Sequence, residues 1–182
     1  MVLDKYSVVT DQARFAGRVL RYHTWQVHHQ QTVGEHCWQM ALIYEQIFGP
    51  PSAEVERFIR YHDAGELIVG DPPFPVKSNN PELKVQYDKI EDEALVHLGI
   101  SIPDIPANER VRVKVCDLLE MMTFGMMEVE MGNRLAIPIV RRTGDKAREL
   151  AYKADIADKE AIIDWIGKQK RHHFQVMDMS DQ

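Results

Sequence analysis

The stretch RYHDAGELIVGD carries four side chains that can bind a metal ion or move a proton: His62, Asp63, Glu66 and Asp71. The residues that lead into it, AEVERFIRYHD, have the spacing of an amphipathic helix. His62 and Asp63 therefore follow an apolar run, where an unpaired charge is costly to bury. Such a pair is expected to have partners elsewhere in the chain.

Two further polar side chains interrupt apolar helical faces. His36 shares a face with the apolar residues four, seven and eleven positions later, and Asp117 breaks an apolar stripe. One inward-facing histidine alone is more often a hydrogen-bonded core residue than a ligand. Two imidazoles and two carboxylates directed into one bundle, however, suit Zn²⁺, Mn²⁺, Fe²⁺ or Co²⁺ and leave positions open for water or substrate. An ion held there would lower the pKa of a water molecule and polarise a phosphoryl oxygen.

The elements that must position these groups are predicted to be helices. Apolar residues recur at helical spacing, and caps and breakers mark the ends. Residues 70–81 are expected to be irregular because they contain four prolines, and residues 101–108 are expected to form a linker. The sequence thus predicts an all-α bundle, with helices over residues 10–22, 35–48, 52–63, 82–98 and 109–131, and one or two more over residues 143–173.

Length and composition limit the possible classes. The chain has 182 residues, of which 45% are hydrophobic and 27% are charged, so we expect one domain over residues 1–182. The net charge of −6 argues against a nucleic-acid polymer as partner. Cys37 and Cys116 lie in apolar helical segments, which suits a reducing cytoplasm. No apolar run is long enough to span a bilayer, so we expect a cytoplasmic protein, in the host cytoplasm if a phage encodes it.

The pattern H…HD…D, formed by His36, His62-Asp63 and Asp117, resembles that of the HD-domain metal-dependent phosphohydrolases. The surrounding segments TVGEH, YHDAGELIVGDPPFPVK and VKVCDLLEMMTFGMMEVEMGN resemble the bacterial 5′-deoxynucleotidases and the phage dATP triphosphohydrolases. The resemblance covers residues 18–133. It implies an HD-domain helical bundle, a divalent transition metal such as Zn, Co or Mn, a small deoxynucleotide substrate and a homo-oligomer, either a dimer or a hexamer.

The resemblance also implies roles for the acidic cluster. His36, His62, Asp63 and Asp117 match the metal ligands. Glu66 matches the catalytic carboxylate, and one helical turn beyond Asp63 it could serve as general base or acid. Asp71 matches a carboxylate that assists the water or an additional metal. Each of the last two has a structural alternative, namely a solvated helix-end carboxylate and an aspartate before a proline-rich turn.

Substrate contacts follow from the same resemblance. Arg21 matches a phosphate-binding arginine, whose fork suits a phosphate, and Lys77 matches a phosphate-contacting lysine, although it could be an ordinary loop lysine. Tyr22 departs from the family, which commonly has a tryptophan packed on the sugar. A tyrosine could still stack there, but its hydroxyl changes the pocket edge, so strict selectivity for deoxynucleotides does not carry over. Thr24 and Trp25 lie where base contacts are expected.

These observations predict hydrolysis of a phosphate ester of a 2′-deoxynucleotide. The stretch RYHTWQVHHQQTVGEHCW is closer to the phage members, so the first prediction is a dATP or dNTP triphosphohydrolase that releases deoxynucleoside and triphosphate. The alternative is a 5′-deoxynucleotidase that converts dNMP to deoxynucleoside and phosphate. Two more distant alternatives are a nucleotide-binding module without chemistry and an enzyme acting on a signalling nucleotide.

Overall fold

The structure, a computed structural model, describes residues 11–73 and 80–180. The chain forms two compact units. Unit 1 contains Met1–Gln26, Gln30–Trp38 and Glu56–Asp104, and unit 2 contains Val27–His29, Gln39–Val55 and Ile105–Gln182. The single domain expected from the length stays a prediction.

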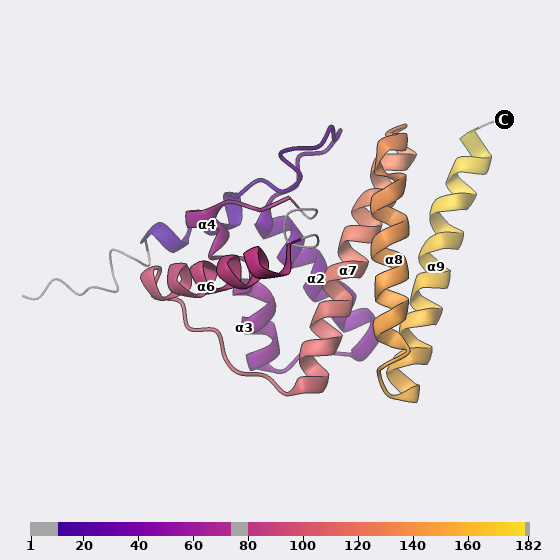
Figure 1. Ribbon diagram of the computed structural model, residues 1–182. Coiled ribbons are helices and arrows are strands. Elements are labelled where there is room, and N and C mark those ends of the chain that lie inside the picture. The colour runs from indigo at the N-terminus through magenta and orange to yellow at the C-terminus, as the bar shows by residue number, and fades with distance from the viewer. Residues whose placement is uncertain (1–10, 74–79, 181–182) are drawn as a thin grey trace, which may run out of the picture. The chain divides into compact units, whose positions relative to one another are not determined.

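Helices account for the regular structure of the described residues, which confirms the all-α prediction (Figure 1). The strand-like pairing in this part of the chain is an isolated antiparallel bridge between Leu20 and Thr32. The α-helices are α2 (Val33–Phe48), α3 (Ala53–Tyr61), α4 (Glu66–Val69), α6 (Pro81–His97), α7 (Ala107–Glu130), α8 (Ile137–Ala151) and α9 (Ile156–Ser180), and the two 3₁₀ turns are η1 (Ala16–Arg18) and η2 (Arg134–Ala136).

Several predicted helix boundaries are confirmed. Ser52 caps α3, since its Oγ accepts a hydrogen bond of 3.3 Å from the Val55 N–H. Gly99 follows α6 with φ of +67°, the left-handed conformation that glycine adopts readily at helix ends. The charged C-terminal segment forms two helices, α8 and α9, with a turn at residues 152–155.

The predicted helix over residues 10–22 is wrong beyond its first turn. Residues 11–13 are helical, but the chain then passes through η1 and runs alongside the segment before α2. The Arg21 N–H donates to the Gln31 carbonyl, and the Val33 N–H donates to the Val19 carbonyl, both at 2.9 Å. These pairings between distant residues satisfy the backbone groups that a helix would have paired locally, so tertiary contacts override the helical spacing of the side chains.

In unit 1, α4 packs against α6 at Gly65, the residue directly before Glu66. A Cβ atom on Gly65 would lie 2.8 Å from the backbone oxygen of Glu91, closer than a side chain can come. The apolar core beside this contact consists of buried Ala16, Ala64 and Leu95 with partly buried neighbours. The glycine therefore allows α4 to approach α6 closely enough to bury Glu66.

In unit 2, the helices α7, α8 and α9 lie side by side (Figure 1). Glycines allow α7 and α8 to approach closely, since a Cβ atom on Gly125 would lie 2.9 Å from Val140 Cγ2. Arg112 of α7 holds α9 through two hydrogen bonds to the Asp158 carboxylate, at 2.7 and 3.0 Å.

Two expectations about the environment of the chain have structural counterparts. Cys37 and Cys116 are buried and form no disulfide within the described part of the chain. Among the described residues, no helix combines the length and the apolar character that crossing a membrane requires.

We predict that Gly65→Ala lowers the free energy of unfolding by about 1–3 kcal/mol, because the added methyl group must push α4 away from the α6 backbone. Urea unfolding followed by circular dichroism measures this. The control is Gly167→Ala in α9, where the nearest atom is the flexible guanidinium of Arg171 at 3.3 Å. This control should be neutral or stabilising by roughly 0.5–1 kcal/mol, since alanine favours a helix. Equal losses in both variants would contradict the prediction.

Candidate metal and catalytic site

His62 lies in the turn immediately after α3, where its ring is fixed from two sides. Nδ1 lies 2.9 Å from the Ile59 carbonyl oxygen, so Nδ1 carries the proton and donates. The ring also stacks on Phe58, with 9° between the planes. Nε2 is buried and makes no hydrogen bond to the described residues. A histidine held in this way presents the Nε2 lone pair, as metal-binding histidines do.

His36 lies on the first turn of α2, and a capping box fixes where that helix begins. The Glu35 N–H donates to Thr32 Oγ1 at 3.2 Å, and the Glu35 carboxylate accepts from the Thr32 N–H at 2.7 Å. His36 directly follows Glu35 and is fully buried. Thr32 and Glu35 were not predicted to be positioning residues, although the spacing T-x-x-E is a recognised sequence signal for this motif.

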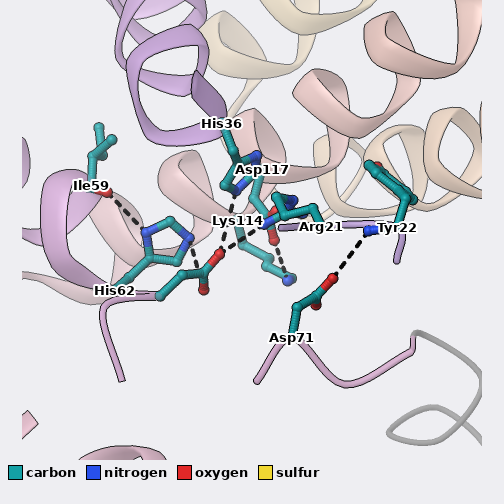
Figure 2. Close-up of polar contacts among 9 residues, drawn as sticks. Arg21, Tyr22, His36, Ile59, His62, Asp71, Lys114 and Asp117 are labelled. Atoms are coloured by element: carbon teal, nitrogen blue, oxygen red, sulfur yellow. Dashed lines mark hydrogen bonds and ion pairs between the residues drawn. The ribbon is translucent and has the colours of Figure 1, made fainter. Parts of the chain in front are cut away.

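Asp63 connects the two histidines. His36 Nε2 lies 3.6 Å from Asp63 Oδ2, and His62 Nε2 lies 3.3 Å from Asp63 Oδ1. The two imidazole rings have centroids 5.6 Å apart (Figure 2). Two imidazole nitrogens and a carboxylate at these separations form a His/Asp donor set that suits a divalent transition metal. Unit 1 thus brings together three of the four predicted ligands.

Arg21 directs its guanidinium at the same aspartate. Its Nη1 donates to Asp63 Oδ2 at 2.9 Å, and the residue is only 7% exposed. Gln30 holds the backbone of this segment, because its side-chain amide donates to the Arg21 carbonyl at 2.7 Å. The predicted phosphate-binding arginine therefore lies beside a predicted metal ligand, where it offsets the negative charge (Figure 2).

Asp71 accepts a hydrogen bond of 3.3 Å from the Tyr22 N–H. Tyr22 has φ of +55°, a conformation uncommon for a residue other than glycine, and the bond to Asp71 helps to hold it there. Burial raises the pKa of Asp71. The positive charge of Arg21 opposes this increase, and the negative charge of Asp63 adds to it. Asp71 therefore has an observed role in positioning the Arg21–Tyr22 segment, and its predicted catalytic role stays a prediction.

Glu66 is buried at the start of α4, with 5% of its surface exposed. Burial is the main cause that raises its pKa to about 9, and the negative charges of Asp63 and Asp71 raise it further, against the charge of Arg21. Its Oε2 is buried and makes no hydrogen bond to the described residues. This environment rules out a solvated helix-end carboxylate and gives a carboxyl group that can hold a proton near neutral pH.

Three predicted site residues remain: Asp117, Thr24 and Lys77. Asp117 belongs to unit 2, where it is largely buried on α7 and pairs with Lys114 one turn earlier (Figure 2). Thr24 is exposed on a turn, so its contact with a base stays a prediction. Lys77 lies outside the described residues.

Comparison with known proteins confirms the resemblance to HD-domain phosphohydrolases. The family described as 5′-deoxynucleotidase YfbR-like matches residues 16–105. A 5′-deoxynucleotidase of Pasteurella multocida is 27% identical over 130 residues, which cover 58% of this chain and 66% of that protein. One from Vibrio vulnificus is 36% identical over 83 residues, 41% of this chain and 43% of that protein. The matches thus span between about two fifths and two thirds of these relatives.

A solved structure extends the likeness to the fold. The HD phosphohydrolase DatZ of cyanophage S-2L, described as bound to dA and one catalytic Zn²⁺ ion, superimposes with a TM-score of 0.71. The match covers 91% of this chain and 96% of that protein at 20% sequence identity. The chain therefore has the HD-domain helical fold that the sequence predicts.

The raised pKa of Glu66 predicts how the stability of the metal-free protein depends on pH. The folded chain keeps a proton that the unfolded chain releases, so the free energy of unfolding should fall as pH rises from 4.5 to about 9. The slope is at most about 1.4 kcal/mol per pH unit. Glu66→Gln should remove this dependence and become more stable than the wild type toward pH 8.

Urea unfolding in EDTA between pH 5 and pH 8 measures the effect. Glu160→Gln is the control because it makes the same chemical change at an exposed residue. Parallel stability curves for the wild type and Glu66→Gln would show that the buried carboxyl group is ionised throughout, contrary to the prediction.

Proposed function

We propose that this chain is a divalent-metal-dependent phosphohydrolase of 2′-deoxynucleotides, and specifically a 5′-deoxynucleotidase that releases phosphate from deoxynucleoside monophosphates. The observation that carries the proposal is the cluster formed by His36, His62 and Asp63, with Arg21 on the same aspartate and Glu66 buried beside it. All five residues lie in the segment that is similar to the 5′-deoxynucleotidase family.

The metal would be held by His36, His62 and Asp63, with Asp117 of unit 2 as the fourth ligand. His36, His62 and Asp117 each offer one ligand atom of a type that could hold a metal ion. One feature of His62 supports metal binding by unit 1: its Nε2 atom is buried and aimed at Asp63, while its Nδ1 is fixed by a backbone carbonyl. When bound, the ion would supply Lewis-acid activation of water and of a phosphoryl oxygen.

Glu66 is the residue to which we assign proton transfer. Breaking the bond between phosphorus and the 5′ oxygen leaves an alkoxide that needs a proton, and the attacking water must lose one. A buried carboxyl group with a raised pKa can hold such a proton near neutral pH, at an Oε2 atom that forms no other hydrogen bond among the described residues. The positive charge of Arg21 limits the increase in the pKa of Glu66 that burial causes.

Substrate recognition is assigned to the Arg21–Tyr22 segment. The guanidinium of Arg21 is already fixed by Asp63, and the Arg21 backbone by Gln30, so its fork can bind a phosphate without a large loss of side-chain entropy. Its side chain lies 5.9 Å from the ring centroid of Tyr22, which places an aromatic surface next to the cation, where a sugar could pack. We retain Lys77 as a second phosphate contact and Thr24 as a base contact, and Asp71 as an assisting carboxylate.

The comparisons favour the monophosphate over the triphosphate. The similar curated proteins are named 5′-deoxynucleotidases, so the activity that the sequence placed second becomes the first proposal. The dATP triphosphohydrolase remains the second candidate, and it rests on the resemblance of the segment RYHTWQVHHQQTVGEHCW to phage proteins. The likeness to the cyanophage structure supports the common fold rather than either substrate.

We predict that the protein loaded with Mn²⁺ or Co²⁺ releases orthophosphate from dAMP or another dNMP. Glu66→Gln should lower the rate by roughly 10²–10⁴-fold, because it keeps the shape of the side chain and removes its ability to transfer a proton. Each dNMP and dNTP is assayed, with separation of the products. Release of tripolyphosphate from dATP, with no phosphate released from any dNMP, would establish the triphosphohydrolase instead. If the protein binds dNMPs, dNTPs or signalling nucleotides but hydrolyses none of them, it is a binding module.

We also predict that Asp117→Ala weakens Co²⁺ binding by at least about tenfold, since it removes a proposed ligand. The control is Asp164→Ala, because Asp164 likewise pairs with a lysine on its own helix but is exposed on α9. Absorption spectroscopy of Co²⁺ titrations measures the affinity. Equal Co²⁺ affinities in the two variants would exclude Asp117 as a ligand without affecting the assignments in unit 1.

A further inference from the structure

Unit 2 contains a cavity of about 560 Å³ among the C-terminal part of α7, η2, α8 and α9. All of its lining residues belong to unit 2, and none is among the residues assigned above to metal, catalysis or substrate. The volume lies within the range of roughly 300–1,000 Å³ that is typical of small-molecule sites.

Apolar side chains form part of the lining of this cavity. Met126 and Val129 contribute from α7, and Ile137 and Val140 contribute from α8. Gly144 adds backbone surface without a side chain, and a Cβ atom there would lie 3.0 Å from the Met122 sulfur. The surface is suited to an aliphatic or planar aromatic group, which would displace water from it.

Four cationic side chains also line the cavity: Arg134, Arg141, Arg148 and Lys170. Among the side chains that the structure describes, only Arg148 of these four forms an ion pair, with Asp145 at 3.5 Å. No carboxylate of a described side chain lies within ion-pair distance of Arg134, Arg141 or Lys170. Unpaired cations around an apolar surface are notable in a protein of net charge −6.

The cavity also has two carboxylates, and both are engaged: Asp145 pairs with Arg148, as described above. Glu130 is engaged by His173, whose Nδ1 lies 2.7 Å from its Oε1. Burial lowers the pKa of Lys170, and the charge of Arg148 lowers it further against a smaller opposing effect of Asp145. The positive charges of Lys170 and Arg148 thus repel each other, and an anion bound near them would relieve this repulsion.

We propose that this cavity binds a small organic phosphate, with its apolar or aromatic body against Met126, Val129 and Val140 and its phosphate at Arg141, Arg134 and Lys170. Guanidinium groups match the geometry of phosphate oxygens and hydrogen-bond them in pairs. A nucleoside monophosphate has this combination of a planar body and a dianionic head, and it is the probe that we choose. The proposal does not depend on the activity assigned to unit 1.

Equilibrium dialysis of the full chain with dAMP in EDTA tests the proposal, because no turnover is expected without metal. The variant is Arg141→Glu and the matched control is Arg142→Glu, its exposed neighbour on α8, which does not line the cavity. Both change the net charge equally. The affinity of Arg141→Glu for dAMP at this site should fall roughly tenfold to a hundredfold. At dAMP concentrations that just saturate the site in the wild type and in Arg142→Glu, Arg141→Glu should therefore bind about one equivalent less.

Inorganic phosphate and deoxyadenosine, assayed separately, test the two halves of the ligand, and each should bind more weakly than dAMP. Lys170→Gln provides a second, milder loss of charge, and circular dichroism checks that each variant is folded. Equal dAMP binding by Arg141→Glu, Lys170→Gln and Arg142→Glu would overturn the proposal. Deoxyadenosine binding as tightly as dAMP would overturn the assignment of the phosphate.

Discussion

The Asp63 carboxylate is the point on which the arrangement of unit 1 depends. It faces two imidazole nitrogens, at 3.3 and 3.6 Å, and accepts a hydrogen bond from the guanidinium of Arg21. A partly buried carboxylate is costly unless it is paired and hydrogen-bonded. Its partners come from separate stretches of the chain, so the turn after α3, the start of α2 and the segment before it must all adopt their observed positions together.

The residues around this carboxylate are held in unusual local states. Tyr22 adopts a positive φ, and burial, together with the negative charges of Asp63 and Asp71, raises the pKa of Glu66. Such departures from local preference concentrate at functional sites, where the surrounding structure maintains them. Here the surrounding structure consists of the capping box of α2, the backbone pairing of residues 19–21 with 31–33, and the close approach of α4 to α6 at Gly65.

The cationic side chains of the two units have different surroundings. In unit 1, Arg21 is buried and its charge is balanced by Asp63. In unit 2, Arg134, Arg141 and Lys170 line an apolar cavity without a carboxylate partner among the described side chains. A buried, paired arginine is rigid and suited to orienting a substrate group, whereas unpaired cations attract an anion from solution. Net charge alone, which is −6, shows neither arrangement.

Local patterns in the sequence indicated which chemistry the candidate site could have and where most of the helices lie. The types and spacing of His36, His62 and Asp63 predicted a metal site. The structure brings the three side chains together, and their role as ligands stays a prediction. Helical periodicity predicted α2, α3 and α7 within a few residues. These features are local, because a 3.6-residue repeat and a cap depend only on neighbours in the chain. The same locality explains why the sequence could not fix the number of phosphates on the substrate.

Contacts between segments that are distant in the sequence became visible only in the folded chain. The tertiary structure replaced the predicted helix over residues 10–22 with a bridge to Thr32, directed Arg21 at Asp63, and gave Asp71 the Tyr22 N–H as a partner. It also raised the pKa of Glu66 and gathered the unpaired cations of unit 2 around a cavity. Hydrogen bonds, burial and electrostatic fields depend on distances in space, and a sequence pattern does not record those distances.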